Sequence, residues 1–170
     1  MAVDIFFKLG DKIKGESIDD GKDGKDAALK DQIDILSWSW SASYSGSFQT
    51  GSGGGAGKAN IGDLSLQKYT DKSTNDIVKH LVSGEHIPTG LLSVRKAGGA
   101  KPLVYYFMEL EDIIISSYNI GGSVGSDDRP VESISLNFAR YRITYTIQDN
   151  KGAAAGKTSA GWDIPKNKTW

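Results

Sequence analysis

The sequence predicts a mainly β fold, a compact antiparallel β-barrel of two curled sheets with one flanking α-helix. Apolar residues recur at every second position in many runs, which is the period of a half-buried strand. In several runs this alternation slips by one residue, as it does at β-bulges where a sheet curls toward a barrel. Only one segment spaces its apolar residues as a helix does. The chain has 170 residues, enough to bury one core, so we expect a single domain over residues 1–170.

The first third of the chain is predicted to contain two strands and two long loops. Residues 3–9 alternate in strand fashion, whereas residues 10–30 are rich in Gly, Asp and Lys and are expected to form a long, mobile loop. The second strand begins at residue 33, and its apolar phase changes between Ile35 and Leu36, which indicates a bulge or sharp bend. Residues 46–58 form a long Gly- and Ser-rich loop, which suggests either disorder or a docking arm.

The middle of the chain contains the predicted helix. A strand over residues 61–69 precedes it, residues 73–76 offer N-capping groups, and Gly84 ends it. Its apolar face is expected to comprise Ile77, Val78, Leu81 and Val82.

The rest of the chain is predicted to be β structure. Residues 91–97 form a strand, and residues 102–117 form a long strand whose beginning is apolar on both faces, so that both faces need a neighbour. The last long strand changes phase between Phe138 and Tyr141. We expect residues 149–160 to be flexible and residues 161–164 to form a short final strand.

The most distinctive stretch places serine at every second position of the second strand. One side is predicted to face the core and carries Trp38, Trp40, Ala42, Tyr44 and Phe48. The other side carries Ser37, Ser39, Ser41 and Ser43. No charged residue occurs between Asp34 and Lys58. A solvated strand would be expected to carry charged residues, so this face suits either a close-packed partner or the wall of an inert passage.

The composition excludes several classes of function. The 20 basic and 21 acidic residues give a formal charge of −1, which argues against a general affinity for nucleic acid or anionic membranes. The absence of cysteine excludes disulfides and thiolate chemistry. The N-terminus lacks the basic and apolar regions of a signal peptide, and no run approaches the ~20 apolar residues of a membrane span. We expect a cytoplasmic protein that, if it leaves the cell, is secreted without a cleavable signal peptide.

Motifs for phosphate, calcium and zinc are incomplete. Residues 52–58 and 152–158 each depart from the Walker pattern, and residues 19–24 lack the ligand spacing of a calcium loop. The two histidines, His80 and His86, lack the spacing of a helical zinc pair. We therefore expect no cofactor and no metal.

No local pattern favours catalysis. Glu109 and Glu111 share a strand face, which could suit glycoside hydrolysis, but such neighbours are more often solvated. No nucleophile elbow supports a dyad of Ser with His80 or His86. The four Trp and seven Tyr residues leave a carbohydrate-binding β-barrel module as an alternative, although most of them occupy predicted core positions. The sequence therefore predicts a protein that is not an enzyme.

The chain resembles the Hcp family, the hemolysin-coregulated proteins of bacterial type VI secretion systems. The resemblance follows family order over almost the whole chain. It is carried by residues 3–8, 33–40, 53–58, 63–69, 71–74, 95–99, 116–117, Glu132 and 135–139. Residues 19–30 and 149–160 depart from the family pattern. Both could alter the faces of the ring that the family forms and the effector proteins that the ring prefers.

The resemblance implies a β-barrel subunit that assembles into a homohexameric ring. Rings would stack into a secreted tube that carries and chaperones small effector proteins in its lumen. The implied partners are further copies of the chain, a VgrG-type spike protein, a contractile sheath and the effectors. On this basis Ser37, Ser39, Ser41 and Ser43 become candidates for the channel lining, and Ser39 aligns with a lumen position in the family. The candidate assembly loop comprises Ser47, Phe48, Gln49, Thr50, Gly53, Gly54, Gly55 and Lys58.

Overall fold

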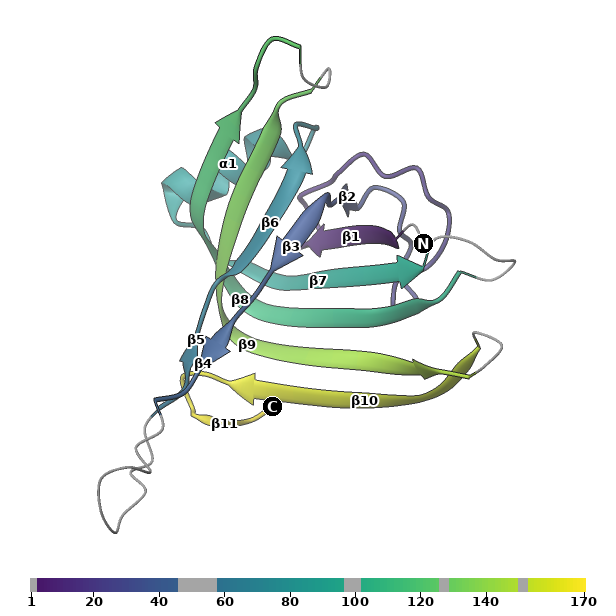
Figure 1. Cartoon of the computed structure of the whole chain (residues 1–170). Helices are drawn as coiled ribbons and strands as arrows, with labels where there is room; N and C mark the ends of the chain where they lie inside the picture. Colours follow the sequence, from purple (N-terminus) through teal and green to yellow (C-terminus); the bar gives the residue numbers. More distant parts are fainter. Residues whose placement is uncertain (1–2, 46–57, 97–101, 126–128, 150–152) are drawn as a thin grey trace.

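The computed structural model describes residues 3–45, 58–96, 102–125, 129–149 and 153–170, and within these ranges it contains eleven strands and one helix (Figure 1). In chain order the elements are β1 (Val3–Leu9), β2 (Ile33–Asp34), β3 (Ser37–Ser39), β4 (Ala42–Ser43), β5 (Asn60–Ile61), β6 (Leu64–Tyr69), α1 (Thr74–Ser83), β7 (Ile87–Lys96), β8 (Val104–Gly121), β9 (Val131–Gln148), β10 (Ala154–Asp163) and β11 (Lys168–Thr169). The strand pairs are antiparallel. The predicted mainly β class with one helix is therefore confirmed for the described residues.

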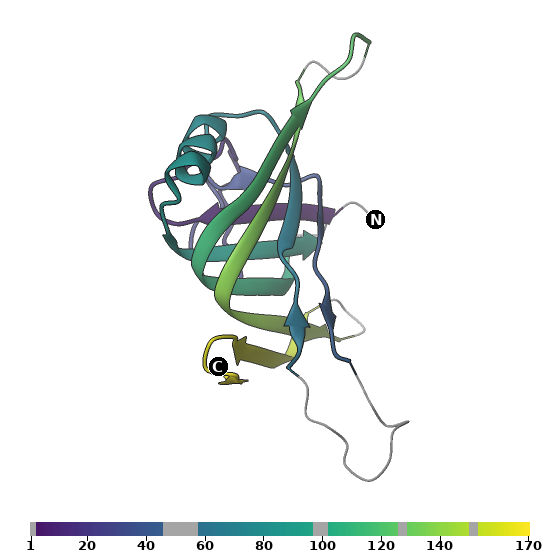
Figure 2. The same ribbon diagram turned by 90° about the vertical axis from the view of Figure 1, so that its left-hand side faces the viewer.

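The long hairpin of β8 and β9 belongs to two layers of β structure. Each of its strands has 18 residues. Near its open end the hairpin lies between β7 and β10, in a first layer with the order β11-β10-β9-β8-β7-β1-β2. Near its tip it pairs with β6, which pairs with β3, and these four strands form a second layer. Figures 1 and 2 show the hairpin curving from one layer into the other.

The hairpin bends where its backbone is irregular. On β8, Asp112 has a φ of 52°, a left-handed conformation that costs about 1 kcal/mol in a non-glycine residue. The register between β8 and β9 then shifts between Ile115 and Ser117. On β9 the core-facing positions change phase after Phe138, so that Tyr141 packs against the core. The phase change expected on this strand is therefore confirmed.

The expected barrel differs from the structure in one respect, because its strand pairing does not close. β2 pairs with β1 and β3 pairs with β6, but β2 and β3 are successive pieces of one chain and do not pair with each other. Two consecutive residues span this junction. The Ile35 N–H donates to the Ile5 carbonyl (2.9 Å), and the Leu36 N–H donates to the Gln67 carbonyl (2.7 Å). The predicted phase slip is the point at which the chain changes its pairing partner.

The core lies between the two layers and includes the predicted tryptophans. Trp38 stacks on Tyr106 with 5.2 Å between ring centroids, and Trp40 lies 4.9 Å from Tyr141. The predicted core face ends there, because Ala42 is exposed and Tyr44 is 53% exposed. Both residues lie in or next to the β4–β5 hairpin, which extends away from the two layers (Figure 2).

The helix α1 begins and ends close to its predicted limits. Gly84 follows it in a left-handed conformation with a φ of 65°, which glycine adopts without steric cost. Ser73 precedes the helix, but its side chain forms no capping hydrogen bond. Of the four residues assigned to its apolar face, Ile77 is buried, whereas Val82 is 77% exposed. The buried face is therefore narrower than the sequence predicts.

Residues 10–30 are an ordered cover on the first layer rather than a mobile loop. Leu29 is completely buried, and Gly24 packs so closely on Phe107 that a Cβ at Gly24 would lie 2.4 Å from that ring. The Arg95 guanidinium holds the segment in place, since it donates to Asp4 (2.8 Å) on β1 and to Asp19 (3.0 Å) within the cover. The sequence gives no sign of these contacts, because they join residues far apart in the chain.

Much of the segment expected to be flexible, residues 149–160, belongs to a strand. β10 begins at Ala154 and pairs with β9 as far as Asp163 opposite Arg140. Its side chains from Ala154 to Ala160 are exposed, so the sequence carries no alternation of buried residues that would reveal it.

We expect Arg95→Ala to lower the free energy of unfolding by about 2 kcal/mol at neutral pH, because charge-assisted hydrogen bonds are lost. Hydrogen bonding from Arg95 also lowers the pKa of Asp19. That contribution is fully present above the ordinary pKa of an aspartate and is lost as the pH falls through the lowered pKa of the folded state. Urea unfolding at neutral and acid pH should therefore show a smaller acid loss in the variant than in the wild type.

A matched control is Arg142→Ala, because this guanidinium lies over the Trp170 ring (4.5 Å) and forms no ion pair with Asp19. The control should keep the acid sensitivity of the wild type. An equal acid loss in Arg95→Ala and the wild type would contradict the role given to Arg95.

Candidate functional site

The outward side of the second layer is a surface of small uncharged polar side chains, which we call the serine face. Its residues form two rows across all four strands, and residues that oppose each other directly on antiparallel strands point to the same side. One row is Ser39, Ser65, Ser135 and Ser117, and the next is Ser37, Gln67, Ser133 and Asn119.

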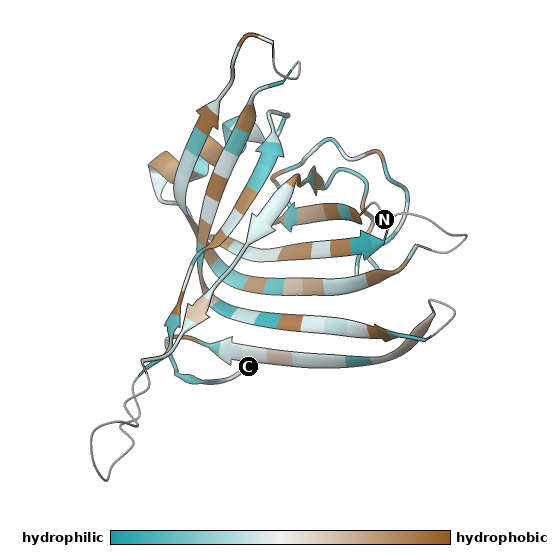
Figure 3. Ribbon diagram, viewed as in Figure 1, coloured by the Kyte–Doolittle hydropathy of each residue, from teal (hydrophilic) through white to brown (hydrophobic). Residues whose placement is uncertain are grey.

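The same strands present the core on their other side. Leu64 and Leu66 on β6 alternate with the polar residues and are buried, as are Leu136 and Ile134, which oppose them on β9. Figure 3 shows this alternation as bands along the strands of the second layer. Since successive side chains of a strand point to opposite sides, the burial of the leucines places the serines on the outer surface.

The middle of the serine face is slightly hollowed. The hollow is lined by residues of β3, β6 and β9, among them Ser37, Ser39 and Ser135. The Ser37 hydroxyl donates to the Gln67 side-chain oxygen (2.9 Å) across its floor. Such groups can form hydrogen bonds with a passing protein surface and carry no net charge.

Charged groups border the serine face without interrupting its two rows. At one end the Asp63 carboxylate accepts hydrogen bonds from Ser116 (2.5 Å) and Asn137 (2.8 Å). At the other end the Arg129 guanidinium lies 4.7 Å above the Tyr69 ring. The surface between these borders is neutral, which suits transient contact with proteins of either charge.

The structure separates the four serines that were predicted to act together. Ser37 and Ser39 are exposed on β3, within the serine face. Ser41 follows β3, and its carbonyl accepts a hydrogen bond from the Gly62 N–H (2.9 Å). Ser43 lies on β4 opposite Asn60, outside the four-stranded layer. Their role in lining a channel stays a prediction.

Six residues of the serine face were not identified from the sequence. They are Ser65, Gln67, Ser117, Asn119, Ser133 and Ser135. A signal was present, because residues 64–67 and 133–137 alternate apolar and polar side chains in the same way as residues 37–40. The order in which the strands pair was missing, and only that order brings the three segments together.

The predicted assembly loop lies almost entirely outside the described residues. This applies to Ser47, Phe48, Gln49, Thr50, Gly53, Gly54 and Gly55, whereas Lys58 is described and exposed. The described residues on either side of the loop form the β4–β5 hairpin, in which Ala42 pairs with Ile61.

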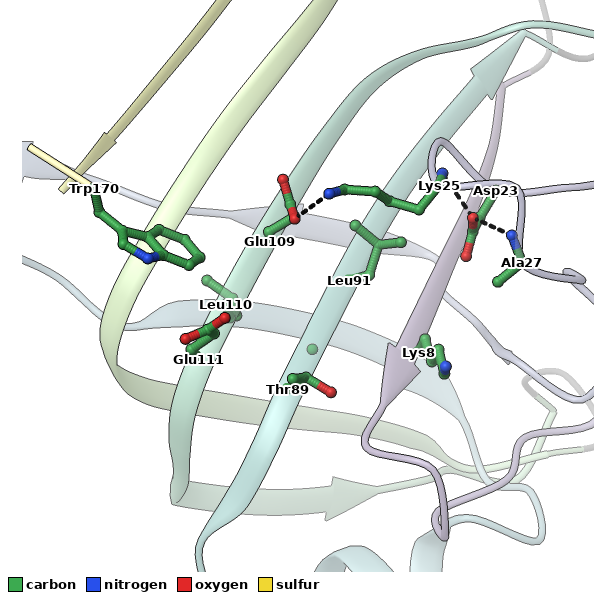
Figure 4. A pocket seen from close by; sticks show the side chains of 11 residues that line it. Lys8, Asp23, Lys25, Ala27, Thr89, Leu91, Glu109, Leu110, Glu111 and Trp170 are labelled. Atoms are coloured by element: carbon green, nitrogen blue, oxygen red, sulfur yellow. Dashed lines mark hydrogen bonds and ion pairs between the residues drawn. The ribbon is translucent and has the colours of Figure 1, made fainter. Parts of the chain in front are cut away.

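A second hollow lies on the first layer between the cover and Trp170 (Figure 4). It contains the two carboxylates considered for glycoside hydrolysis. The Glu109 carboxylate pairs with Lys25 Nζ (2.7 Å), and the Glu111 carboxylate pairs with Arg140 Nη2 (2.8 Å). Each carboxylate is therefore directed at its own cation, which is typical of surface ion pairs.

The two histidines contribute to a third hollow beside the end of α1, with Asp11 and Glu85. His80 Nδ1 lies 2.7 Å from the Asp76 carbonyl of its own helix. Within the described residues no three His, Cys, Asp or Glu side chains are grouped so as to hold a metal ion. Over the same part of the chain, no helix has the length and apolar character needed to cross a membrane.

A family model, a curated protein and several solved structures match most of the chain. The model of a family described as "Type VI secretion system effector, Hcp" matches residues 6–145. Protein hcp1 of Pseudomonas aeruginosa is 45% identical over 168 residues, which are 98% of each chain. A solved type six secretion system protein has a TM-score of 0.88 at 30% identity, covering 99% of this chain and all of the other. Hcp1 of Salmonella typhimurium has a TM-score of 0.76 at 31% identity over the whole of both chains.

The two sides of β6 should respond differently to substitution. We expect Leu66→Ser to lower the free energy of unfolding by about 3 kcal/mol, because it removes a buried aliphatic group and buries a hydroxyl. Gln67→Val, at the next position, should change it by less than about 0.5 kcal/mol, because Gln67 is exposed. Urea denaturation of both variants measures the difference, and equal losses would contradict the assigned orientation of β6.

Proposed function

Because this chain belongs to the Hcp family of type VI secretion proteins, we propose that it is the subunit of a homohexameric ring. Rings stack into the inner tube, which is secreted without a cleavable signal peptide and carries small effector proteins in its lumen. The observation that carries the proposal is the neutral serine face on a layer whose two outer strands have no second strand partner among the described residues.

The open edges support a ring of copies. Among the described strands, β3 pairs only with β6, and the part of β8 beyond Ile113 pairs only with β9. An exposed strand edge has main-chain groups ready to pair with another chain. Copies joined edge to edge would continue the layer, and a closed ring of identical contacts satisfies every edge. The serine faces of the copies would then form one continuous wall.

The chemistry of that wall suits the transport of proteins. Small hydroxyl and amide side chains remain hydrated and offer hydrogen bonds, but the two rows of the serine face present no charge that would hold a cargo tightly. Effectors would be held weakly enough to be released. Ser37 and Ser39 are the proposed lumen residues from the first prediction, and Ser65, Ser133 and Ser135 join them. In this proposal Ser41 and Ser43 lie toward the edge of the wall.

The proposed partners are further copies of the chain, a VgrG-type spike protein, a contractile sheath and effectors in the lumen. The loop at residues 46–58 is proposed as an arm that contacts adjacent subunits or rings. Two features support this role: the β4–β5 hairpin, whose strands flank the loop, extends away from the two layers (Figure 2), and Tyr44 beside it is 53% exposed.

The role is structural rather than enzymatic. A carbohydrate-binding module would need exposed aromatic platforms, whereas Trp38 and Trp40 pack against Tyr106 and Tyr141. These rings contribute to the core, so the observations favour the tube subunit over the sugar-binding alternative.

Light scattering of the purified protein tests the ring directly. We expect a mass of about six times that of the 18.3 kDa chain, with annular particles in negative stain, because closed cyclic symmetry satisfies both strand edges. A variant that lacks residues 51–55 should form fewer rings and stay folded. A monomer at every concentration would contradict assembly in solution, and rings of unchanged stability in the deletion variant would contradict the arm.

Ser39→Gln tests the lumen assignment. The longer side chain should leave the ring mass unchanged and reduce the amount of effector that is retained when ring and effector are purified together. Gln67→Asn, which shortens a side chain on the same face, serves as a matched polar control. Loss of rings in Ser39→Gln would instead place Ser39 in an interface between subunits.

A further inference from the structure

The side chains on the two faces of β6 do little to decide which residues of β9 lie opposite them. On the serine face, Ser65 and Gln67 oppose Ser135 and Ser133. If β6 slid by two residues, Gln67 would oppose Ser135 and Ser65 would oppose Asn137, which are again small polar pairs. A slide by two residues keeps every side chain on its own face, so the burial of one face, which opposes a slip by one residue, does not oppose it.

The apolar rows would tolerate the same slip. Leu66 opposes Ile134 in the structure and would oppose Leu136 after a slide by two residues. Leucine and isoleucine have similar volumes, and such exchanges within a core cost little. The one core-facing residue of β6 whose environment would change in kind is Lys68, which would move from Glu132 to face Ile134.

Lys68 and Glu132 form a buried ion pair at the end of this ladder. They oppose each other directly, their charged atoms lie 2.8 Å apart, and both side chains are completely buried. The ammonium also contacts Asp71 (2.9 Å) and donates to the Tyr69 carbonyl (2.8 Å). The second oxygen of Glu132 accepts a hydrogen bond from the Thr74 hydroxyl (2.7 Å) at the start of α1.

Such a pair raises the free energy of the slipped register by more than it lowers the free energy of the native register. Replacing both partners of a buried ion pair with apolar residues is often neutral, whereas leaving one charge buried alone is strongly unfavourable. A slip of two residues would separate Lys68 from Glu132 and leave the Glu132 carboxylate buried without its cation. We propose that the Lys68–Glu132 pair sets the register of β6 against β9 and thereby positions the residues of the serine face.

The consequence reaches the whole second layer. A slip by two residues would move β6 and its partner β3 by about 6.8 Å along β9. Ser39 and Ser65 would then no longer share a row with Ser135 and Ser117. Lys68 and Glu132 are therefore positioning residues for the serine face. Their proposed role lies within the single chain and does not depend on whether copies form a ring.

Engineered disulfides can read the register, because the chain has no cysteine of its own. Ser65→Cys with Ser135→Cys places two thiols directly opposite in the native register, within the reach of a disulfide. Gln67→Cys with Ser135→Cys places them diagonally, beyond that reach, unless β6 has slipped. Each pair is introduced into the wild type and into Lys68→Met/Glu132→Leu, and the yield of disulfide is measured after brief mild oxidation.

In the wild-type background we expect only the 65–135 disulfide to form. In Lys68→Met/Glu132→Leu we expect the 65–135 yield to fall and the 67–135 disulfide to appear. A third pair, Ser117→Cys with Ser135→Cys across β8 and β9, should form equally in both backgrounds, since that ladder does not include Lys68. If the double variant keeps the 65–135 disulfide alone, the register is set elsewhere and the proposal is wrong.

A milder variant decides the question if the double variant does not fold. Glu132→Gln removes the negative charge and keeps the shape of the side chain. By the same argument, it should allow some 67–135 disulfide while circular dichroism still shows the native β signal. A folded Glu132→Gln protein that forms the 65–135 disulfide alone would overturn the proposal.

Discussion

The bend of the β8–β9 hairpin is the constraint on which the other features of the structure depend. Without it, two strands of 18 residues would form one extended ladder with the same face exposed along its whole length. The left-handed Asp112 and the register shift after Ile115 turn the ladder instead. Residues of the first layer, such as Met108, and of the second layer, such as Leu136, then contribute to one core.

The core and the candidate functional surface arise from the same alternation. Along β6 and the tip half of β9, buried aliphatic residues alternate with polar residues of the outward side. Any change in register therefore alters the surface and the core together. This coupling explains why a buried charged pair is compatible with the fold. Its cost in desolvation is offset within a network that includes Asp71 and Thr74.

Several features of the single chain suit its assembly with further copies. The outer strands of the second layer have open edges, and the β4–β5 hairpin extends beyond the layers with Tyr44 exposed. The first layer differs, because residues 10–30 cover it and Arg95 holds that cover in place. The cover does not extend over β10, whose side chains from Ala154 to Ala160 are exposed.

The sequence by itself determined the mainly β class, the single helix near residues 74–83, the phase changes after Ile35 and Phe138, and the family. Each of these is a local pattern, or an ordered set of local motifs, and needs no knowledge of which strands meet. Local pattern also identified Ser37 and Ser39 as unusual. It misjudged residues 10–30 and 154–160, where order comes from distant partners such as Arg95 and β9.

Only the tertiary structure decided that Ser65 and Ser135 complete the serine face, that Ser43 lies apart from it, and that strand pairing does not close the barrel. Lys68 and Glu132 are separated by 64 positions, and no local signal in the chain specifies that they meet. The side on which a residue points follows from the two-residue period of its own strand. Its neighbours across the sheet follow from pairing between distant segments, which depends on the packing of the whole molecule.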